Sequence, residues 1–322
     1  MNCRTLGKSG IQVSEIGIGA WQLGGPLVLD GKVDGHPELG REFCVDLIRQ
    51  CGDLGINFVD TAEQYGNGES ERRVGEALRG RRQKWIISTK FGHQVGPNGE
   101  RLRDASPKRA PVSLEGSLKR LQTDYVDVYL YHIAPLAGEA EETVKFLESA
   151  KKRGQVRAVG ISTNSLKDAE FLDSLGCLDV IQFSHSMLDP PDPIIPFVAR
   201  HELGGVVRGS FAGGRLSGKY FHRKPKFGPD DIRSGRFPDS ESAAADFARY
   251  AVFEELLTPR RGMIQLALRH LLDEPTTHVI IPGGKSTEDY RQAIRATEIP
   301  PLSPEEKLRV EELKAGLLKR QL

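Results

Sequence analysis

The chain has 322 residues, of which 38% are hydrophobic and 28% charged, and its formal net charge at pH 7 is +1. This composition indicates a folded globular protein, and a charge so close to zero argues against nucleic acid or an anionic membrane as the main partner. The sequence shows neither a secretory signal nor an apolar run long enough to span a membrane, and its four cysteines have no metal-ligand spacing, so we expect a cytoplasmic protein with reduced thiols.

Residues 4–13 are expected to form a β-hairpin that plugs the bottom of the fold. Eight short runs with strand character follow, and most are apolar throughout, which is typical of parallel strands covered by helices. These runs are residues 16–19, 56–59, 85–89, 126–131, 157–161, 179–183, 205–209 and 278–282. Helical patterns lie between them, at residues 42–54, 70–78, 112–121, 139–152 and 263–272. Alternating strands and helices predict an α/β fold, a (β/α)8 TIM barrel, and because no linker divides the chain we expect one domain over residues 1–322.

Ionisable side chains stand at the ends of three consecutive strand-like runs. The second run ends at Asp60, and Tyr65 follows on a glycine-flanked loop; Lys90 ends the third run and His132 the fourth. Barrel enzymes carry their chemistry on the loops that follow the carboxyl ends of the strands. Because burying such groups without a purpose would be costly, they predict a catalytic cluster.

A long loop is expected after the seventh strand, over residues 211–240, before a helix near residues 243–257. Loops of this length in compact barrels are usually functional. Residues 213–219 nearly match the phosphate loop G-x-x-x-x-G-K-[ST], but Tyr220 stands where that motif needs serine or threonine and no helix-forming run follows. This argues against a nucleoside triphosphatase. No metal site is predicted either, because metal-ligand spacing is missing among His93, His201, His222 and His270.

Taken in order along the chain, these features resemble the aldo-keto reductase family over nearly the whole length. Asp60-Thr61-Ala62 with Tyr65-Gly66 and the following Glu-Ser-Glu is similar to the aspartate–tyrosine motif of that family. Lys90 and His132 match its other two catalytic positions by context. Residues 210–220 (SFAGGRLSGKY) are similar to its cofactor-covering loop, and residues 281–286 (IPGGKS) to its segment for the adenosine phosphate.

The resemblance implies a reaction in which Tyr65 protonates a carbonyl oxygen while the carbonyl carbon receives hydride. A tyrosine, with an ordinary pKa near ~10, is a poor acid at neutral pH. A lysine ammonium in the place of Lys90 stabilises the phenolate, and Asp60 would hold that lysine in position. His132 would hydrogen-bond the same carbonyl oxygen. The nicotinamide cofactor supplies the hydride.

The cofactor site implied by the resemblance is not a Rossmann site, since no G-x-G-x-x-G follows a strand. A cation at Lys285 would pair with a 2′-phosphate and favour NADPH over NADH. His185 would replace the tyrosine that usually stacks on the nicotinamide; a charged imidazole there would repel the oxidised ring, whereas a neutral one would only fill the space. Trp21 suits an apolar pocket wall or barrel-top packing. The residues expected to bind the cofactor are Trp21, Ser162, Thr163, Gln182, His185, Ser210, Phe211, Gly213, Lys219, Gly283, Lys285 and Gln292.

The sequence therefore predicts an NADPH-dependent oxidoreductase that reduces small-molecule aldehydes or ketones and can run in reverse. One alternative is a nicotinamide-binding barrel with weak turnover that acts as a redox-responsive interaction partner. Another is a barrel isomerase or lyase that uses the same cluster without nicotinamide. The substrate and the oligomeric state are left open. The cations of residues 92–109 would favour an anionic carbonyl compound or simply belong to a solvated loop.

Overall fold

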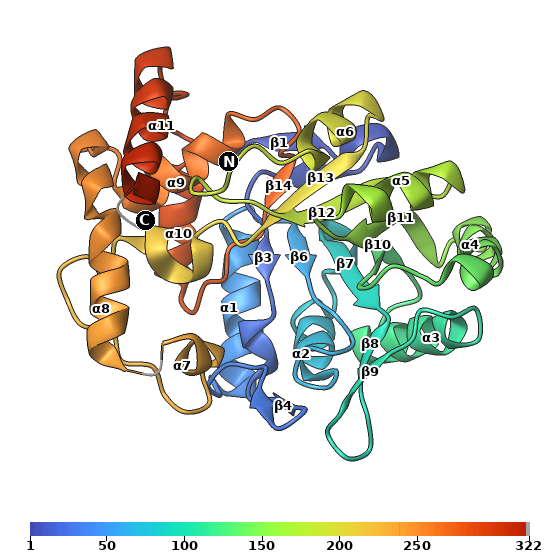
Figure 1. The fold of residues 1–322 in the computed structure, drawn as a ribbon. Coiled ribbons are helices and arrows are strands. Elements are labelled where there is room, and N and C mark those ends of the chain that lie inside the picture. Colours follow the sequence, from blue (N-terminus) through green and yellow to red (C-terminus); the bar gives the residue numbers. More distant parts are fainter. Residues whose placement is uncertain (238, 320–322) are drawn as a thin grey trace.

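The computed structural model of the protein describes residues 1–237 and 239–319. A parallel sheet of eight strands lies at its centre, surrounded by helices (Figure 1). The strand order is β14-β13-β12-β11-β10-β7-β6-β3. Their bounds are β3 (Ile18–Gly19), β6 (Phe58–Asp60), β7 (Ile86–Phe91), β10 (Val126–Tyr131), β11 (Val156–Ser162), β12 (Val180–Ser184), β13 (Gly204–Arg208) and β14 (Val279–Ile280).

Backbone hydrogen bonds close this sheet into a barrel. The Gly17 amide donates to the Ile280 carbonyl at 2.8 Å, and the Ile280 amide donates to the Glu15 carbonyl at 2.9 Å. Ile16 and Ile280 thereby pair in parallel, so the last strand lies beside the first. The predicted (β/α)8 barrel and its eight strand positions are confirmed.

The helices that cover the sheet pack apolar side chains against it. In α1 (Arg41–Asp53) the buried residues Cys44, Val45, Leu47, Ile48 and Cys51 recur at helical spacing. The two cysteines are free thiols, and burial raises the pKa of Cys51 to about 12. The remaining helices are α2 (Glu69–Ala77), α3 (Arg109–Leu121), α4 (Ala137–Lys152), α5 (Leu166–Ser174), α6 (Ile194–Arg200), α7 (Ile232–Arg236), α8 (Ser240–Ala248), α9 (Met263–Leu272), α10 (Thr287–Arg295) and α11 (Pro304–Lys319).

The predicted N-terminal hairpin is present and fills one end of the barrel. Its strands β1 (Cys3–Thr5) and β2 (Gln12–Ser14) pair antiparallel. Leu6, Ile11 and Val13 are buried with residues from the beginnings of the barrel strands: Phe58, Val128, Ala158, Val180, Val206 and Val279. The carboxyl ends of the barrel strands therefore lie at the opposite end, which we call the mouth.

The loops at the mouth carry structure that the sequence did not indicate. One hairpin, β4 (Val28–Leu29) with β5 (Lys32–Val33), follows β3, and another, β8 (His93–Val95) with β9 (Arg101–Arg103), follows β7. The two are joined because the Asp30 amide donates to the Gly99 carbonyl at 3.0 Å. The long loop after β13 contains a 3-10 segment at residues 212–217 and α7, and the helix expected near residues 243–257 is present as α8 followed by a 3-10 segment at residues 249–256. Within the described ranges, no helix has both the length and the apolar character that crossing a membrane requires.

Candidate active site

Side-chain alternation along the strands determines which residues face the barrel axis. Val180 and Val206 belong to the buried cluster inside the barrel, whereas Ile181 and Val207 pack in the outer core beneath the helices. Because strand side chains alternate between the two faces, Gln182 and Arg208 point inward, one layer nearer the mouth. Asp60 lies two residues beyond Phe58 and Ser162 four residues beyond Ala158, both members of the inner cluster, so these two side chains also face inward.

Lys90 lies at the centre of this layer and is fully buried. Its ammonium donates to Asp60 Oδ2 at 2.6 Å, to the Thr61 carbonyl at 2.8 Å and to Tyr65 Oη at 3.0 Å. These acceptors use all three of its N–H bonds. Burial acts to lower the pKa of Lys90, but the charge of Asp60 and the phenol of Tyr65, with their hydrogen bonds, outweigh it and raise that pKa. The lysine is therefore a fixed cation next to the phenol.

Asp60 is held by a second set of hydrogen bonds that leads toward β11 and β12. Its Oδ1 accepts from Ser88 Oγ at 2.9 Å and from Gln182 Nε2 at 2.7 Å. Ser162 Oγ in turn donates to Gln182 Oε1 at 3.0 Å. The aspartate, the glutamine and the serine thus form one network, and the carboxylate that fixes the lysine is itself fixed.

The loop that presents Tyr65 is anchored by backbone contact with the loop after β3. Gly66 has a φ of +57°, and a Cβ at this position would lie 2.0 Å from the Gly24 carbonyl oxygen. Ser70 adds a polar anchor, because its hydroxyl donates to the Ala20 carbonyl at 2.8 Å and lies 2.8 Å from Thr61 Oγ1. The position of the phenol is therefore set by two loops rather than one.

His132 continues the ladder beyond β10, where its amide donates to the Phe91 carbonyl at 2.8 Å. Its ring lies edge-on to Tyr65, with centroids 5.9 Å apart, and to His93, at 4.8 Å. Burial, together with the charges of Lys90, His93 and Arg208, lowers the pKa of His132 well below its ordinary value. The imidazole is therefore neutral at physiological pH and suits a hydrogen-bonding role rather than that of an acid.

Trp21 lies beside the phenol and forms part of the wall of the mouth. Its ring centroid is 6.2 Å from that of Tyr65 and 5.0 Å from that of His36, and its indole N–H donates to the Asp34 carbonyl at 3.2 Å. The Asp34 carboxylate also pairs with Arg101 at 2.9 Å. The hairpins after β3 and β7 therefore meet next to Tyr65.

The other predicted cofactor residues fall into separate groups. Ser210, Phe211, Gly213 and Lys219 lie together on the loop after β13, and Gly283 packs against Gln22. The Thr163 hydroxyl accepts a hydrogen bond from the Ser165 amide at 2.9 Å and so belongs to the turn before α5. Gln292, on α10, accepts a hydrogen bond from Gln265 Nε2 at 3.0 Å.

His185 follows the carboxyl end of β12, and its ring centroid lies 6.4 Å from that of Phe183. It follows Ser184 in β12, so it lies on the same side as Phe183, which packs in the outer core. The charged groups acting on its ring include Asp189, Asp192 and Lys314, which lie outside the barrel layer, and burial is the main cause that lowers its pKa.

Lys285 follows β14 and lies near the long loop after β13. Its ammonium is 3.9 Å from Asp231 Oδ2, and the same carboxylate receives two hydrogen bonds from Arg233, at 2.9 Å and 2.7 Å. Burial acts to raise the pKa of Asp231, but the hydrogen bonds from Arg233 outweigh it and hold that pKa at about 2. The Ile232 amide also donates to the Gly35 carbonyl at 3.0 Å, which ties this loop to the first hairpin.

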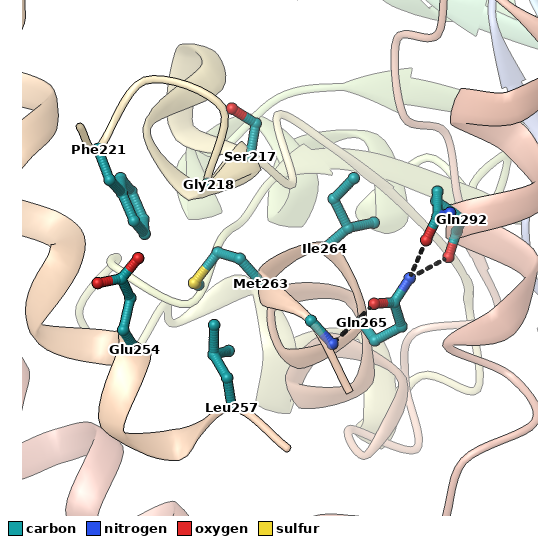
Figure 2. Close-up of a pocket in the computed structure, with 10 residues that line it drawn as sticks. Ser217, Gly218, Phe221, Glu254, Leu257, Met263, Ile264, Gln265 and Gln292 are labelled. Atoms are coloured by element: carbon teal, nitrogen blue, oxygen red, sulfur yellow. Dashed lines mark hydrogen bonds between the residues drawn. The ribbon is translucent and has the colours of Figure 1, made fainter. Parts of the chain in front are cut away.

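A cavity of about 300 Å³ lies beside this loop, between the 3-10 segments and the beginning of α9 (Figure 2). Phe221, Leu257 and Met263 give it an apolar side, and Gln265 and Gln292 form its polar side. A second cavity, of about 330 Å³, is lined by residues of the loop after β10, including Ile133 and Leu136. Neither has Tyr65 in its lining.

Two residues at the mouth, Asp231 and Arg208, were not identified from the sequence. Asp231 stands in an irregular segment that carries no motif. Arg208 had a visible signal, because it is a cation that ends the apolar run Gly-Gly-Val-Val. In the part of the chain that the structure describes, no group of three or more histidine, cysteine or acidic side chains could hold a metal ion.

Comparison with known proteins shows the family to which the chain belongs. The sequence model described as the Aldo/keto reductase family matches residues 15–315. The protein named aldo-keto reductase YhdN of Bacillus subtilis is 30% identical over 295 residues, covering 88% of this chain and 85% of its own length.

Two solved structures share the fold. The holo form of aldo-keto reductase AKR11C1 from Bacillus halodurans is 28% identical, with a TM-score of 0.79, covering 97% of this chain and 96% of that one. An aldo/keto reductase from Klebsiella pneumoniae in complex with NADP and acetate is 25% identical, with a TM-score of 0.69, covering 97% and 95%. The chain belongs to the aldo/keto reductase family, whose members are NAD(P)H-dependent oxidoreductases acting on carbonyl and alcohol pairs.

Proposed function

We propose that this chain reduces aldehydes or ketones to alcohols with Tyr65 as the proton donor. The observation that carries the proposal is the Lys90 ammonium, buried and hydrogen-bonded to both Asp60 and Tyr65. As a proton leaves the phenol, negative charge develops next to a cation that cannot move away. The neutral ring of His132 would donate a hydrogen bond to the same substrate oxygen and orient it.

A nicotinamide dinucleotide fits the side chains at the mouth. Ser162 and Gln182 offer the amide and hydroxyl groups that hold a carboxamide, and the cations Lys219, Arg233 and Lys285 act on one another near the loop after β13. Such a cluster suits phosphate groups. The cavity in Figure 2 would receive the adenine, between Phe221 and Met263 on its apolar side and Gln292 on its polar side. When bound, the nicotinamide supplies the hydride.

The hydrogen bonds of the Lys90 ammonium to Asp60 and Tyr65 support an enzyme over an interaction partner with weak turnover. We therefore expect Tyr65→Phe to lower the rate of carbonyl reduction by ~10²- to 10⁴-fold, since it removes only the transferable proton. The measurement is oxidation of the reduced cofactor with a panel of short aldehydes, sugars and phosphorylated aldehydes. A variant as fast as the wild type with a saturating aldehyde would refute the role of Tyr65, provided that cofactor binding is unchanged.

We also propose that NADPH is preferred over NADH, on the basis of Lys285. The relatives differ on this point, since one carries NADP and an Escherichia coli relative, 32% identical over 198 residues, is named NADH-specific methylglyoxal reductase. Lys285→Met should weaken NADPH binding more than NADH binding, by the ~1.5–3 kcal/mol of a charged hydrogen bond. Lys219→Met is the matched control, because a contact with the pyrophosphate would affect both cofactors. Equal losses in Lys285→Met would contradict the preference.

A further inference from the structure

Arg208 is the last residue of β13. It is a cation of the same inner layer as Lys90, but the proposed reaction gives it no role. Its Cα partner across the ladder is Ser184, two residues beyond Gln182 on β12. Val206, two residues earlier on its own strand, lies inside the barrel. Strand alternation therefore directs the Arg208 side chain toward the mouth, on the same side of the barrel as Gln182 and Ser162.

The Arg208 guanidinium is half-buried and forms no hydrogen bond or ion pair within residues 1–237 and 239–319. Other arginines at the mouth are paired: Arg101 with Asp34 and Arg233 with Asp231. The carboxylate of Asp60, in the same inner layer, is already hydrogen-bonded to Lys90, Ser88 and Gln182. Holding a partly desolvated cation without a partner costs free energy. We therefore expect a bound ligand to contact the Arg208 guanidinium.

The surroundings of Arg208 show which end of a dinucleotide it would meet. Its charge acts on the ring of His132, the residue expected at the substrate oxygen. Ser162 and Gln182, on the two preceding strands, are the residues proposed to hold the carboxamide. The cations suited to phosphates, Lys219 and Lys285, belong instead to the loops after β13 and β14. Arg208 therefore lies at the nicotinamide end.

We propose that Arg208 selects the redox state of the bound cofactor. The inference rests on the proposed function, because it requires a nicotinamide dinucleotide at the mouth. The oxidised nicotinamide ring carries a positive charge and the reduced ring is neutral, so a guanidinium against that ring disfavours the oxidised form alone. Arginine stays protonated at all accessible pH values and its planar head stacks on rings. The bias is therefore independent of pH, unlike one that would arise from a histidine.

The test compares dissociation constants for NADP⁺ and NADPH, measured by calorimetry from pH 5.5 to 8, with NAD⁺ and NADH as a second pair. In Arg208→Gln we expect the ratio of the oxidised to the reduced constant to fall by about tenfold or more, the size of effect that a unit charge at contact distance gives in a partly screened site. Arg208→Lys should keep most of the wild-type ratio, because it keeps the charge. His185→Gln, which alters the outward-facing neighbour, should leave the ratio unchanged.

Three results would contradict either the role of Arg208 or the proposed function. A ratio that is equal in Arg208→Gln and wild type, or a loss that is the same for both redox states, would overturn the role of Arg208. A wild-type ratio that changes with pH and becomes flat in His185→Gln would assign the effect to the histidine instead. If wild type bound neither the NADP(H) nor the NAD(H) pair, the proposed function itself would fail. Thermal unfolding of each variant checks folding, and removing a guanidinium without a partner leaves no group of the chain unpaired.

Discussion

Lys90 and Asp60 act on the phenol in different ways, although they form one ion pair at 2.6 Å. Lys90 provides the charge next to Tyr65, whereas Asp60 provides the position of that charge. Asp60 is shared with Ser88 and Gln182, so the lysine still has the Thr61 carbonyl as an acceptor when the carboxylate is changed.

We therefore expect Lys90→Met to impair turnover more than Asp60→Asn does. Loss of the cation removes the stabilisation of the phenolate, an effect on the order of the ~10²- to 10⁴-fold contribution of a positioned acid. Loss of the carboxylate charge leaves the cation present but less firmly held. The pH dependence of kcat and the dissociation constant of the reduced cofactor should be measured for both. A larger defect in Asp60→Asn would reverse the two roles.

The positions of Asp60, Lys90 and His132 at strand ends could be predicted from the sequence, whereas the directions of the Arg208 and His185 side chains could not. The first three end apolar runs, and the expected strand bounds fall close to the observed ones. His185 was expected to face the nicotinamide because of its place in a motif. Its direction depends on the register of β12, and a shift of one residue turns a side chain to the other face of the sheet. Sequence composition does not determine that register.

At the scale of elements, the barrel strands and most helices were predictable, and the hairpins at the mouth were not. Long apolar runs and helical periodicity carry a strong local signal. The strands β4 and β5 have two residues each and depend on contacts between loops, such as the bond from the Asp30 amide to the Gly99 carbonyl. A contact between segments far apart in sequence leaves no periodic pattern in either of them.

The N-terminal hairpin supports stability rather than catalysis, because it fills the end of the barrel opposite the mouth. Ile11 is only 1% exposed and packs inside the barrel. Ile11→Ala should lower the free energy of unfolding by ~2–5 kcal/mol, as for other large-to-small changes in a core. Lys8→Ala, an exposed change in the same hairpin, should have an effect within about 0.5 kcal/mol. Denaturant titration measures both, and a loss of kcat in fully folded Ile11→Ala would contradict this separation.

At the scale of the whole molecule, we propose that residues 1–322 act as one folding unit. The pairing of Ile16 with Ile280 joins parts of the chain that are distant in sequence, and the Arg4 guanidinium donates to the Thr277 carbonyl at 2.7 Å. Opening the barrel where Ile16 pairs with Ile280 would expose the inner cluster to water.

Acid should destabilise the molecule through buried histidines as well as through its carboxylates. Burial is the main cause that lowers the pKa values of His36, His93 and His270 to about 4, whereas in an unfolded chain histidine titrates near ~6.5. Between these two pH values the unfolded chain binds more protons, so the free energy of unfolding falls as pH decreases through this window. Each histidine contributes at most about 1.4 kcal/mol per pH unit.

The measurement is denaturant unfolding at pH values from about 7 down to 4. His270→Gln should show a shallower loss of stability with acid than wild type, because one proton-binding site of the unfolded chain is removed. An equal slope in the two proteins would show that His270 is not held neutral by burial.

The contact between Gly24 and Gly66 has a consequence for the tolerance of this chain to mutation. Each glycine occupies the space in which a Cβ of the other would stand: a Cβ on Gly24 would lie 2.9 Å from the Gly66 nitrogen, and one on Gly66 would lie 2.0 Å from the Gly24 carbonyl oxygen. Even alanine at Gly66 would push apart the loops that set the phenol of Tyr65. A map of random substitutions would thus mark as indispensable two residues that have no side chain and take no part in the chemistry.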